Sequence, residues 1–185
     1  MVSIISLGLP ILLSAVCIWI TSAIIWMLLP HHKSDFKGFP DEDATRNALL
    51  PQDLAPGQYD IPHLTSRDDL KKPEVIKKFE EGPAGFFTIV PKGVPKTVKS
   101  MILSLLYYIV IGVFVAYIGG RTLYPSGESL EVFRVTDTVA WLAYGWGIIP
   151  EAIWFGRPWS AIIKHLIDTF IYAIITAIIF SLLWA

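Results

Sequence analysis

The sequence predicts an all-α integral membrane protein with about four transmembrane helices. Of its 185 residues, 54 % are hydrophobic, and the mean hydropathy is +0.55, which is high for a soluble domain. The apolar residues are gathered in long runs with few charges, as membrane-spanning helices require. The remaining polar residues fall mainly in one proline-rich segment between the first and second runs.

Residues 1–29 are predicted to form the first transmembrane helix. The run from Leu7 to Leu29 contains no charged residue and is long enough to cross about 30 Å of hydrocarbon. The first residues carry no Lys or Arg, and no A-x-A cleavage site follows the run, so we interpret it as a retained anchor and not a signal peptide.

Residues 30–97 are predicted to form an extramembrane, partly irregular cap. This segment and its immediate border hold nine of the thirteen prolines. We expect a short helix beginning at the acidic residues Asp41 to Asp43, and a second helix from Pro73 to Glu81 that ends at Gly82. The stretch 51–63 is dense in turn formers and is expected to be irregular. The whole segment is too short and too rich in proline for a well-buried catalytic domain.

Three more spans are predicted after the cap. They cover residues 98–119, 135–155 and 161–185, separated by a loop at 120–134 and a turn at 156–160. The third span is expected to kink or divide near Pro150, because proline removes a backbone donor inside a helix.

The distribution of Lys and Arg predicts the orientation. One side of the membrane carries Lys33, Lys37, Lys92, Lys96, Lys99, Arg157 and Lys164, and the other carries only Arg121 and Arg134. By the positive-inside rule, residues 30–97 are cytoplasmic and both termini lie outside. We therefore expect a multi-pass protein of a bacterial plasma membrane.

This topology gathers five polar residues at the same membrane face as the cap: Glu151, Arg157, Lys164, His165 and Asp168. Asp168 lies about 10 Å along the last span, where a carboxylate is costly unless it is paired or faces the bundle interior. In a structural interpretation, Arg157 or Lys164 pairs with the carboxylates, and Lys164 and Asp168 have the i, i+4 spacing that suits a pair. In a functional interpretation, a carboxylate and His165 relay protons, bind a metal or contact a quinone.

No motif indicates a metal or a cofactor. Carboxylates and imidazoles are suitable ligands, but there is no HExxH or comparable spacing. The topology also brings His31, His32 and His63 to this face. The adjacent His31 and His32 cannot both project from one helix face, which makes them weak evidence for chelation.

The last span carries a row of small residues at every fourth position: Thr169, Ala173, Ala177 and Ser181. Such a row lets another helix approach closely. It serves either packing within the protein's own bundle or docking of another subunit.

Tryptophans are placed where the membrane boundaries should lie, and Trp26, Trp141, Trp159 and Trp184 are expected to be interfacial anchors. Tyr144 and Trp146 lie deeper, where packing or a pocket for a pigment, quinone or lipid are both open interpretations.

The function is not encoded in a recognisable motif. A net charge of −1 gives no basic surface for nucleic acid, and the single cysteine, Cys17, cannot form a disulfide framework. There is no P-loop, GxSxG elbow, dinucleotide fingerprint or haem attachment site. These absences favour a non-enzymatic accessory, assembly or stabilising subunit that contacts the lipid bilayer and other membrane subunits. The alternatives are a small oligomeric transporter or proton conductor that uses Glu151, His165 and Asp168, and a membrane enzyme acting on lipid or quinone.

Overall fold

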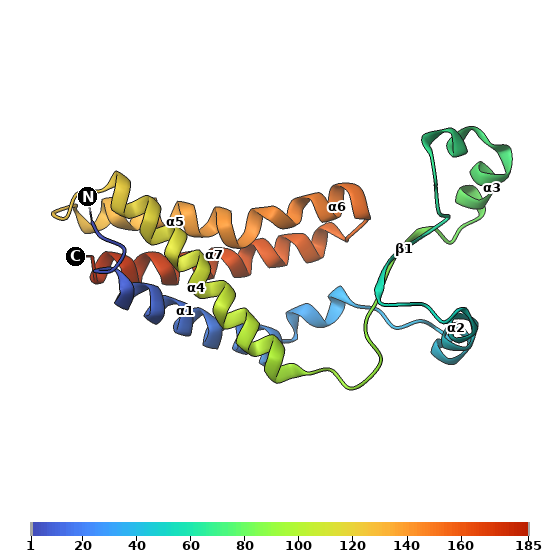
Figure 1. Ribbon diagram of the computed structural model, residues 1–185, viewed down its shortest axis with the longest axis horizontal. Helices are drawn as coiled ribbons and strands as arrows, with labels where there is room; N and C mark the ends of the chain where they lie inside the picture. Colours follow the sequence, from blue (N-terminus) through green and yellow to red (C-terminus); the bar gives the residue numbers. More distant parts are fainter. Residues whose placement is uncertain (1, 185) are drawn as a thin grey trace. The chain divides into compact units, whose positions relative to one another are not determined.

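The computed structural model describes residues 2–184 and divides into two compact units. We call one the hairpin unit, which comprises Phe36–Pro95 and Glu151–Arg157. The other, the bundle, comprises the rest of the described chain and contains the long helices seen side by side in Figure 1. Each unit is described by itself below.

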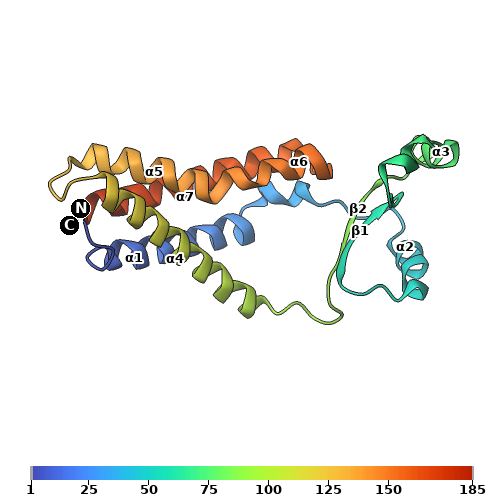
Figure 2. The ribbon, with the colours of Figure 1, turned by 45° about the horizontal axis from the view of Figure 1, so that its top comes forward.

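Four helices run along the bundle: α1 (Gly8–Ala23), which continues into a π-helical turn (Ile24–Leu28), α4 (Thr97–Thr122), α5 (Ser129–Gly145) and α7 (Trp159–Leu182). Figures 1 and 2 place the two ends of the chain at the same end of the bundle. The segments Gly8–Leu28, Thr97–Thr122 and Trp159–Leu182 are long and apolar enough to cross a membrane. The protein is therefore predominantly helical and membrane-spanning, as predicted.

The outward faces of these three helices consist of exposed aliphatic and aromatic side chains, which include Leu12, Ile20, Leu103, Phe114 and Ile167. A soluble monomer rarely exposes an apolar surface of this extent to water, whereas such a surface is suited to contact with lipid. Helix α5 is shorter and carries Glu131, Arg134 and Asp137 within its seventeen residues.

Helix α5 differs from its prediction at both ends. It begins at Ser129 and not at residue 135. It ends at Gly145, where a 3-10 turn (Trp146–Ile148) leads into the short helix α6 (Ile149–Phe155). The division therefore lies before Pro150, which occupies the first turn of α6. Pro150 has no N–H to donate to the carbonyl of Trp146, so the regular helix is broken one turn upstream of the proline.

Residues 36–95 of the hairpin unit contain two short helices and two strands. They are α2 (Glu42–Leu49), β1 (Gly57–Ile61), α3 (Pro73–Glu81) and β2 (Gly85–Ile89), with 3-10 turns at Leu50–Gln52 and Arg67–Lys71. Both predicted helices are confirmed. The Asp41 side chain caps α2 by accepting a hydrogen bond from the Ala44 N–H (2.8 Å). Gly82, with φ +64°, ends α3.

The expectation that residues 51–63 are irregular is wrong. Strand β1 lies inside this stretch and pairs antiparallel with β2, in a register that places Tyr59 opposite Phe87. Its partner lies 28 residues along the chain, so the turn-forming residues around β1 gave no local sign of the pairing. Two strands joined by such a long connection lack the two-residue turn sequence by which a short hairpin can be recognised.

The hairpin unit has no hydrophobic core of its own. Within residues 36–95, Asp69 is the one buried residue. Large apolar side chains are exposed throughout: Phe36, Phe39, Leu49, Leu50, Ile61, Leu70, Ile76, Phe79, Phe86, Phe87, Val90 and Val94. The unit is held instead by the strand pairing and by polar contacts such as those of Asp69 with Thr65, Ser66 and Lys72.

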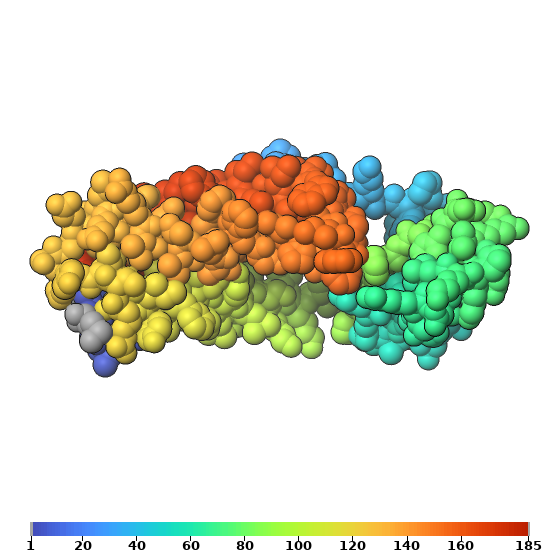
Figure 3. All heavy atoms as spheres, turned by 90° about the horizontal axis from the view of Figure 1, so that it is seen from above, coloured from blue at the N-terminus to red at the C-terminus, as the bar shows by residue number. Residues whose placement is uncertain are grey.

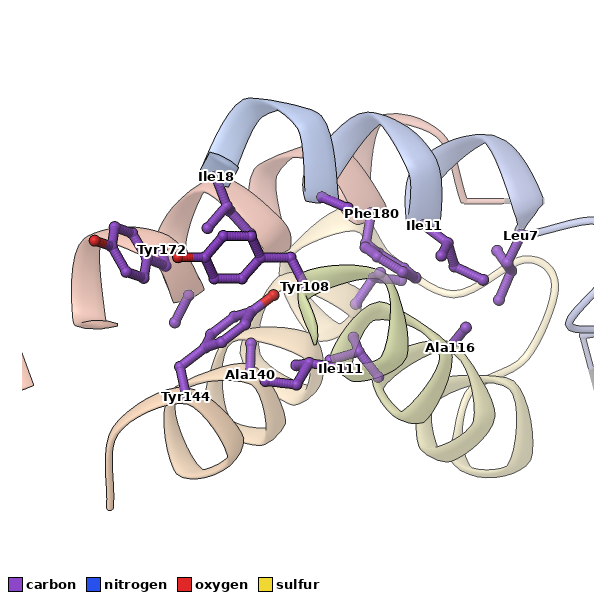
Figure 4. Close-up of a cluster of buried hydrophobic side chains, with 14 of the residues drawn as sticks. Leu7, Ile11, Ile18, Tyr108, Ile111, Ala116, Ala140, Tyr144, Tyr172 and Phe180 are labelled. Carbon is purple, nitrogen blue, oxygen red and sulfur yellow. The ribbon is translucent and has the colours of Figure 1, made fainter. Parts of the chain in front are cut away.

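The core of the bundle is formed by side chains from all four long helices (Figure 4). Phe180 lies beside Ile11 at one end of the core, and Ile18 lies further along, beside the tyrosines. Three tyrosines, Tyr108, Tyr144 and Tyr172, pack edge to face further along, with ring centroids 6.0–6.2 Å apart. Each ring comes from a different helix, so the cluster joins α4, α5 and α7.

Close approach of α5 and α7 depends on small residues. Figure 3 shows the side chains of these helices in contact. A Cβ added at Gly145 would collide with the Thr169 hydroxyl oxygen and would lie 3.3 Å from Cδ2 of Leu166. The Thr169 hydroxyl is itself fixed by donating to the carbonyl of His165 (2.9 Å). Gly145 is therefore the contact point that sets the distance between these helices.

We expect Gly145→Ala to lower stability by about 1–3 kcal/mol, because overpacking forces the helices apart. Thermal unfolding in detergent, followed by far-UV circular dichroism, measures this effect. Gly147→Ala is the matched control, because an added Cβ there meets nothing within 4 Å. The double variant with Thr169→Ala should recover part of the loss, and an unchanged melting temperature for Gly145→Ala would contradict the close contact.

Candidate functional site

A cluster of polar side chains forms where the chain leaves α1 and passes the first turns of α7. The π-helical turn ends at Leu28, Leu29 is extended, and Pro30 begins a 3-10 turn (Pro30–Asp35). Proline suits the start of such a turn and biases the residue before it towards extended backbone. The turn carries two histidines and one carboxylate towards α7, and all of these residues belong to the bundle.

Asp168 is the centre of the cluster. Its side chain is only 3 % exposed, and each of its oxygens contacts a different imidazole. Nε2 of His32 lies 2.6 Å from Oδ2, and Nε2 of His31 lies 3.1 Å from Oδ1. A buried carboxylate is tolerated when both oxygens have partners, and here both are supplied by adjacent residues of one turn.

Asp35 and Lys164 form the second layer. Nδ1 of His32 lies 2.6 Å from Oδ2 of Asp35, and the Lys164 ammonium donates to Oδ1 of the same carboxylate (2.7 Å). Lys164 also donates to the His31 carbonyl (2.5 Å) and to the Ser34 hydroxyl (2.7 Å). All three ammonium protons thus have acceptors. Hydrogen bonds from His32 and from Lys164 hold the pKa of Asp35 below its ordinary value.

His32 bridges two carboxylates. An ionised carboxylate can only accept hydrogen bonds, so His32 donates from both ring nitrogens when Asp35 and Asp168 are both ionised, and it is then the imidazolium cation. Together with Lys164, this gives two positive charges against two negative charges. A balanced cluster of this kind is the form in which charges are buried beside a membrane at least cost.

The orientation of His32 is fixed by Trp26. The two rings are stacked with centroids 3.7 Å apart and an angle of 3° between their planes. Trp26 lies in the π-helical turn, a feature that often marks functional positions. The His32 side chain is 5 % exposed, whereas that of His31 is 35 % exposed. The cluster is therefore reachable from outside on the His31 side.

Lys164 and Asp168, which are among the five residues predicted to form the polar cluster, both belong to this site. Lys164 pairs with Asp35 rather than with Asp168. The His165 carbonyl accepts from Thr169. Glu151 and Arg157 belong to the hairpin unit, where the Arg157 N–H donates to the Glu151 carbonyl (3.1 Å).

The row of small residues on α7 lies mostly inside the bundle. Thr169, Ala173 and Ala177 are buried, and Ser181 donates to the carbonyl of Ile178. These residues pack against the protein's own helices, as the contact of Thr169 with Gly145 illustrates.

The predicted interfacial tryptophans have different surroundings. Trp141 donates to the Leu166 carbonyl (3.2 Å), Trp184 donates to the Tyr124 carbonyl (3.0 Å), and Trp159 is exposed. Tyr144 and Trp146 are engaged in aromatic packing.

Sequence reasoning missed the central role of His31 and His32. Adjacent residues of a long helix diverge, but these two lie in a short turn beside α7, with ring centroids 4.0 Å apart. The available signal was the string Pro30-His31-His32 directly after an apolar run, together with an acidic residue inside the last run. Their three ligand-type atoms, one from each of His31, His32 and Asp168, lie within 4.8 Å of one another.

Removing the charge of Asp168 should destabilise the bundle. We expect Asp168→Asn to cost roughly 3 kcal/mol, because the buried His32 ring loses one of the two carboxylates that it contacts. The same substitution at Asp137 is the control, since its buried Oδ1 has no hydrogen-bond partner among the residues that the structure describes. Chemical unfolding of both variants in detergent should separate them. Equal stability of the two would show that the Asp168 contacts do not hold the bundle.

Comparison of the chain with models of known protein families, with curated protein sequences and with solved structures gave no match.

Proposed function

We propose that this protein is a non-catalytic accessory or stabilising subunit of a larger membrane complex, in which the bundle is the anchor and the hairpin unit contacts a partner. The observation that carries the proposal is the uncovered apolar surface of residues 36–95. Twelve large apolar side chains are exposed there, and no apolar side chain is buried. A folded segment with this composition is typical of a surface that becomes covered in a complex.

A groove on the hairpin unit is the best candidate for the contact. Its volume is about 440 Å³, and its apolar lining comes from α2, the turn after it and β2, with Phe39, Leu49, Leu50, Leu54 and Ile89. Charged residues, Glu42, Arg46, Asp53 and Lys92, stand around it. An apolar centre with a polar rim is the usual anatomy of a protein interface.

The charge of the segment favours a protein partner over an anionic membrane surface. Residues 36–95 contain eight Lys and Arg against ten Asp and Glu. Binding to anionic lipid relies on clusters of basic residues without this compensation. The apolar side chains are also spread over helices, turns and strands, whereas an interfacial membrane helix gathers them on one face.

The proposed arrangement has four spans, with α5 as the fourth. It places both termini outside and residues 30–97 in the cytoplasm of a bacterium, where a cytoplasmic or membrane partner can reach them. The cluster at Asp168 supports this arrangement, because it ties residues 31–35 to α7. These contacts hold residues 31–35, where the extramembrane segment begins, beside α7.

The test is a native pull-down in mild detergent through a C-terminal tag that lacks histidines. We expect larger membrane subunits to co-purify in stoichiometric amounts. The double substitution of Phe39→Glu and Leu50→Glu should reduce their yield about tenfold or more, because it places charge in an apolar contact. Lys77→Glu is the control, since Lys77 is exposed and lies outside the groove.

Two outcomes would oppose the proposal. One is purification of the protein alone or only with itself. The other is a partner yield that the groove variant does not change while the bundle stays folded, as judged by an unaltered melting temperature.

Proton conduction is a second candidate, favoured by a row of hydroxyl groups next to Asp168. Tyr172 and Thr176 follow Asp168 on the same face of α7 at intervals of four residues, and the Thr176 hydroxyl lies 3.5 Å from that of Tyr144. The Tyr172 hydroxyl has no hydrogen-bond partner among the residues that the structure describes, so a proton relay along this row requires water between Asp168 and the hydroxyl groups. In proteoliposomes, this function requires a proton flux that Asp168→Asn abolishes without unfolding the protein, whereas the accessory role requires no flux.

A further inference from the structure

We propose that His31, His32 and Asp168 form a binding site for one divalent transition-metal ion, with Zn²⁺ as the probe of that class. The first argument is the donor set. Two imidazole nitrogens and one carboxylate oxygen are the ligands that such ions prefer, and three protein ligands leave a fourth position for water or another group. The atoms lie within 4.8 Å of one another.

The second argument is that the ligand atoms already converge. In a tetrahedral zinc site with ligands at 2.0–2.1 Å, neighbouring ligand atoms are about 3.3 Å apart. Nε2 of His31 lies 3.1 Å from Oδ1 of Asp168, and Nε2 of His32 lies 2.6 Å from Oδ2. These two contacts are to different oxygens of the carboxylate, and one ligand atom from each of the three residues lies within 4.8 Å of the others. Shifts of the side chains on the order of 1 Å would therefore bring the three atoms to the spacing of a tetrahedral site.

The third argument is the layer behind the ligands. A metal-bound histidine almost always donates its second ring N–H to a carboxylate or a carbonyl. His32 meets this requirement, because its Nδ1 faces Asp35 (2.6 Å) and Lys164 in turn holds Asp35 (2.7 Å). The stacked indole of Trp26 fixes the plane of the His32 ring. A hydrogen bond between His32 and Asp168 would form without Asp35, Lys164 and Trp26 around it, whereas a metal-bound histidine needs such partners.

The fourth argument is access. His32 and Asp168 are almost fully buried, whereas about a third of the His31 side chain is exposed. An ion can therefore enter beside His31 and displace the proton between His32 and Asp168, which leaves to solvent. Neutral His31 binds the ion through Nε2 when its one proton is on Nδ1, so it releases no proton. One cation held by a carboxylate and two neutral imidazoles keeps the site close to charge balance. This site is independent of the groove on the hairpin unit.

His63, a histidine outside the cluster, provides a comparison within the same chain. His63 also faces a carboxylate, with Nδ1 2.5 Å from Oδ1 of Asp60, but the pair is exposed and belongs to the hairpin unit. No second imidazole joins it among residues 2–184, since the candidate group of metal ligands in that part of the chain is His31, His32 and Asp168. A histidine and an aspartate in contact are thus not sufficient to build the site.

Isothermal titration of the detergent-solubilised, metal-stripped full chain with Zn²⁺ tests the proposal. We expect one ion per chain. His31→Ala and His32→Ala should weaken binding by more than the roughly 10- to 100-fold that follows loss of an outer partner. Asp35→Asn should weaken it about tenfold, since it keeps an acceptor for His32 but removes the charge. His63→Ala should bind Zn²⁺ like the wild type.

Two further measurements distinguish the loss of a metal-binding side chain from a defect in folding. His31→Ala removes one partner of Asp168, so its melting temperature without metal is measured first and serves as its own reference. Zn²⁺ should raise the melting temperatures of the wild type and of His63→Ala, and should leave that of His31→Ala at its metal-free value. Co²⁺ should give the intense visible absorption of a four-coordinate site in the wild type and not in His31→Ala. The proposal is overturned if the wild type takes up no Zn²⁺, or if His31→Ala and His32→Ala bind it as the wild type does.

Discussion

The need to satisfy the Asp168 carboxylate organises one end of the bundle. A charged oxygen in the first turns of an apolar helix has to find donors, since neither lipid nor aliphatic side chains supply them. The donors come from the turn after α1, which is more than 130 residues away in the sequence. The carboxylate therefore links the turn after the first helix, α1, to the last helix, α7. Because of this link, the chain after α1 bends towards α7 before it leaves the bundle.

The consequences extend through the neighbouring groups. With His32 between Asp168 and Asp35, and Lys164 beside Asp35, no member of the cluster is left with an uncompensated charge. The stacking of Trp26 on His32 then ties the π-helical turn to the same point. No charged side chain follows Asp168 on α7, and close packing positions the rest of the helix, with Gly145 making room for Thr169. Electrostatics at one end and close packing along the rest thus position the same helix.

Most of the membrane architecture could be predicted from the sequence, because long apolar runs have one main explanation. The cap of α2 at Asp41 and the end of α3 at Gly82 were also predictable, since each depends on local chemistry. Strand β1 was not, because its partner is distant. The site was predicted in part: Lys164 and Asp168 carried a clear signal as charges in an apolar run, but the i, i+4 spacing suggested the wrong partner. Long-range pairing decides which donor Asp168 receives, and a pattern within one helix cannot reveal it.

The lack of a hydrophobic core in the hairpin unit affects how readily proteases can degrade the protein. Residues 36–95 have no buried apolar side chain, so little free energy opposes local opening of this segment. Proteases cleave chains in proportion to the population of such open forms. A copy that stands alone in the membrane is therefore vulnerable, and a bound partner would protect it by covering the same surface. Under the proposed accessory role, the abundance of the protein would follow that of the proposed partner without a dedicated regulator, because proteases would remove unassembled copies.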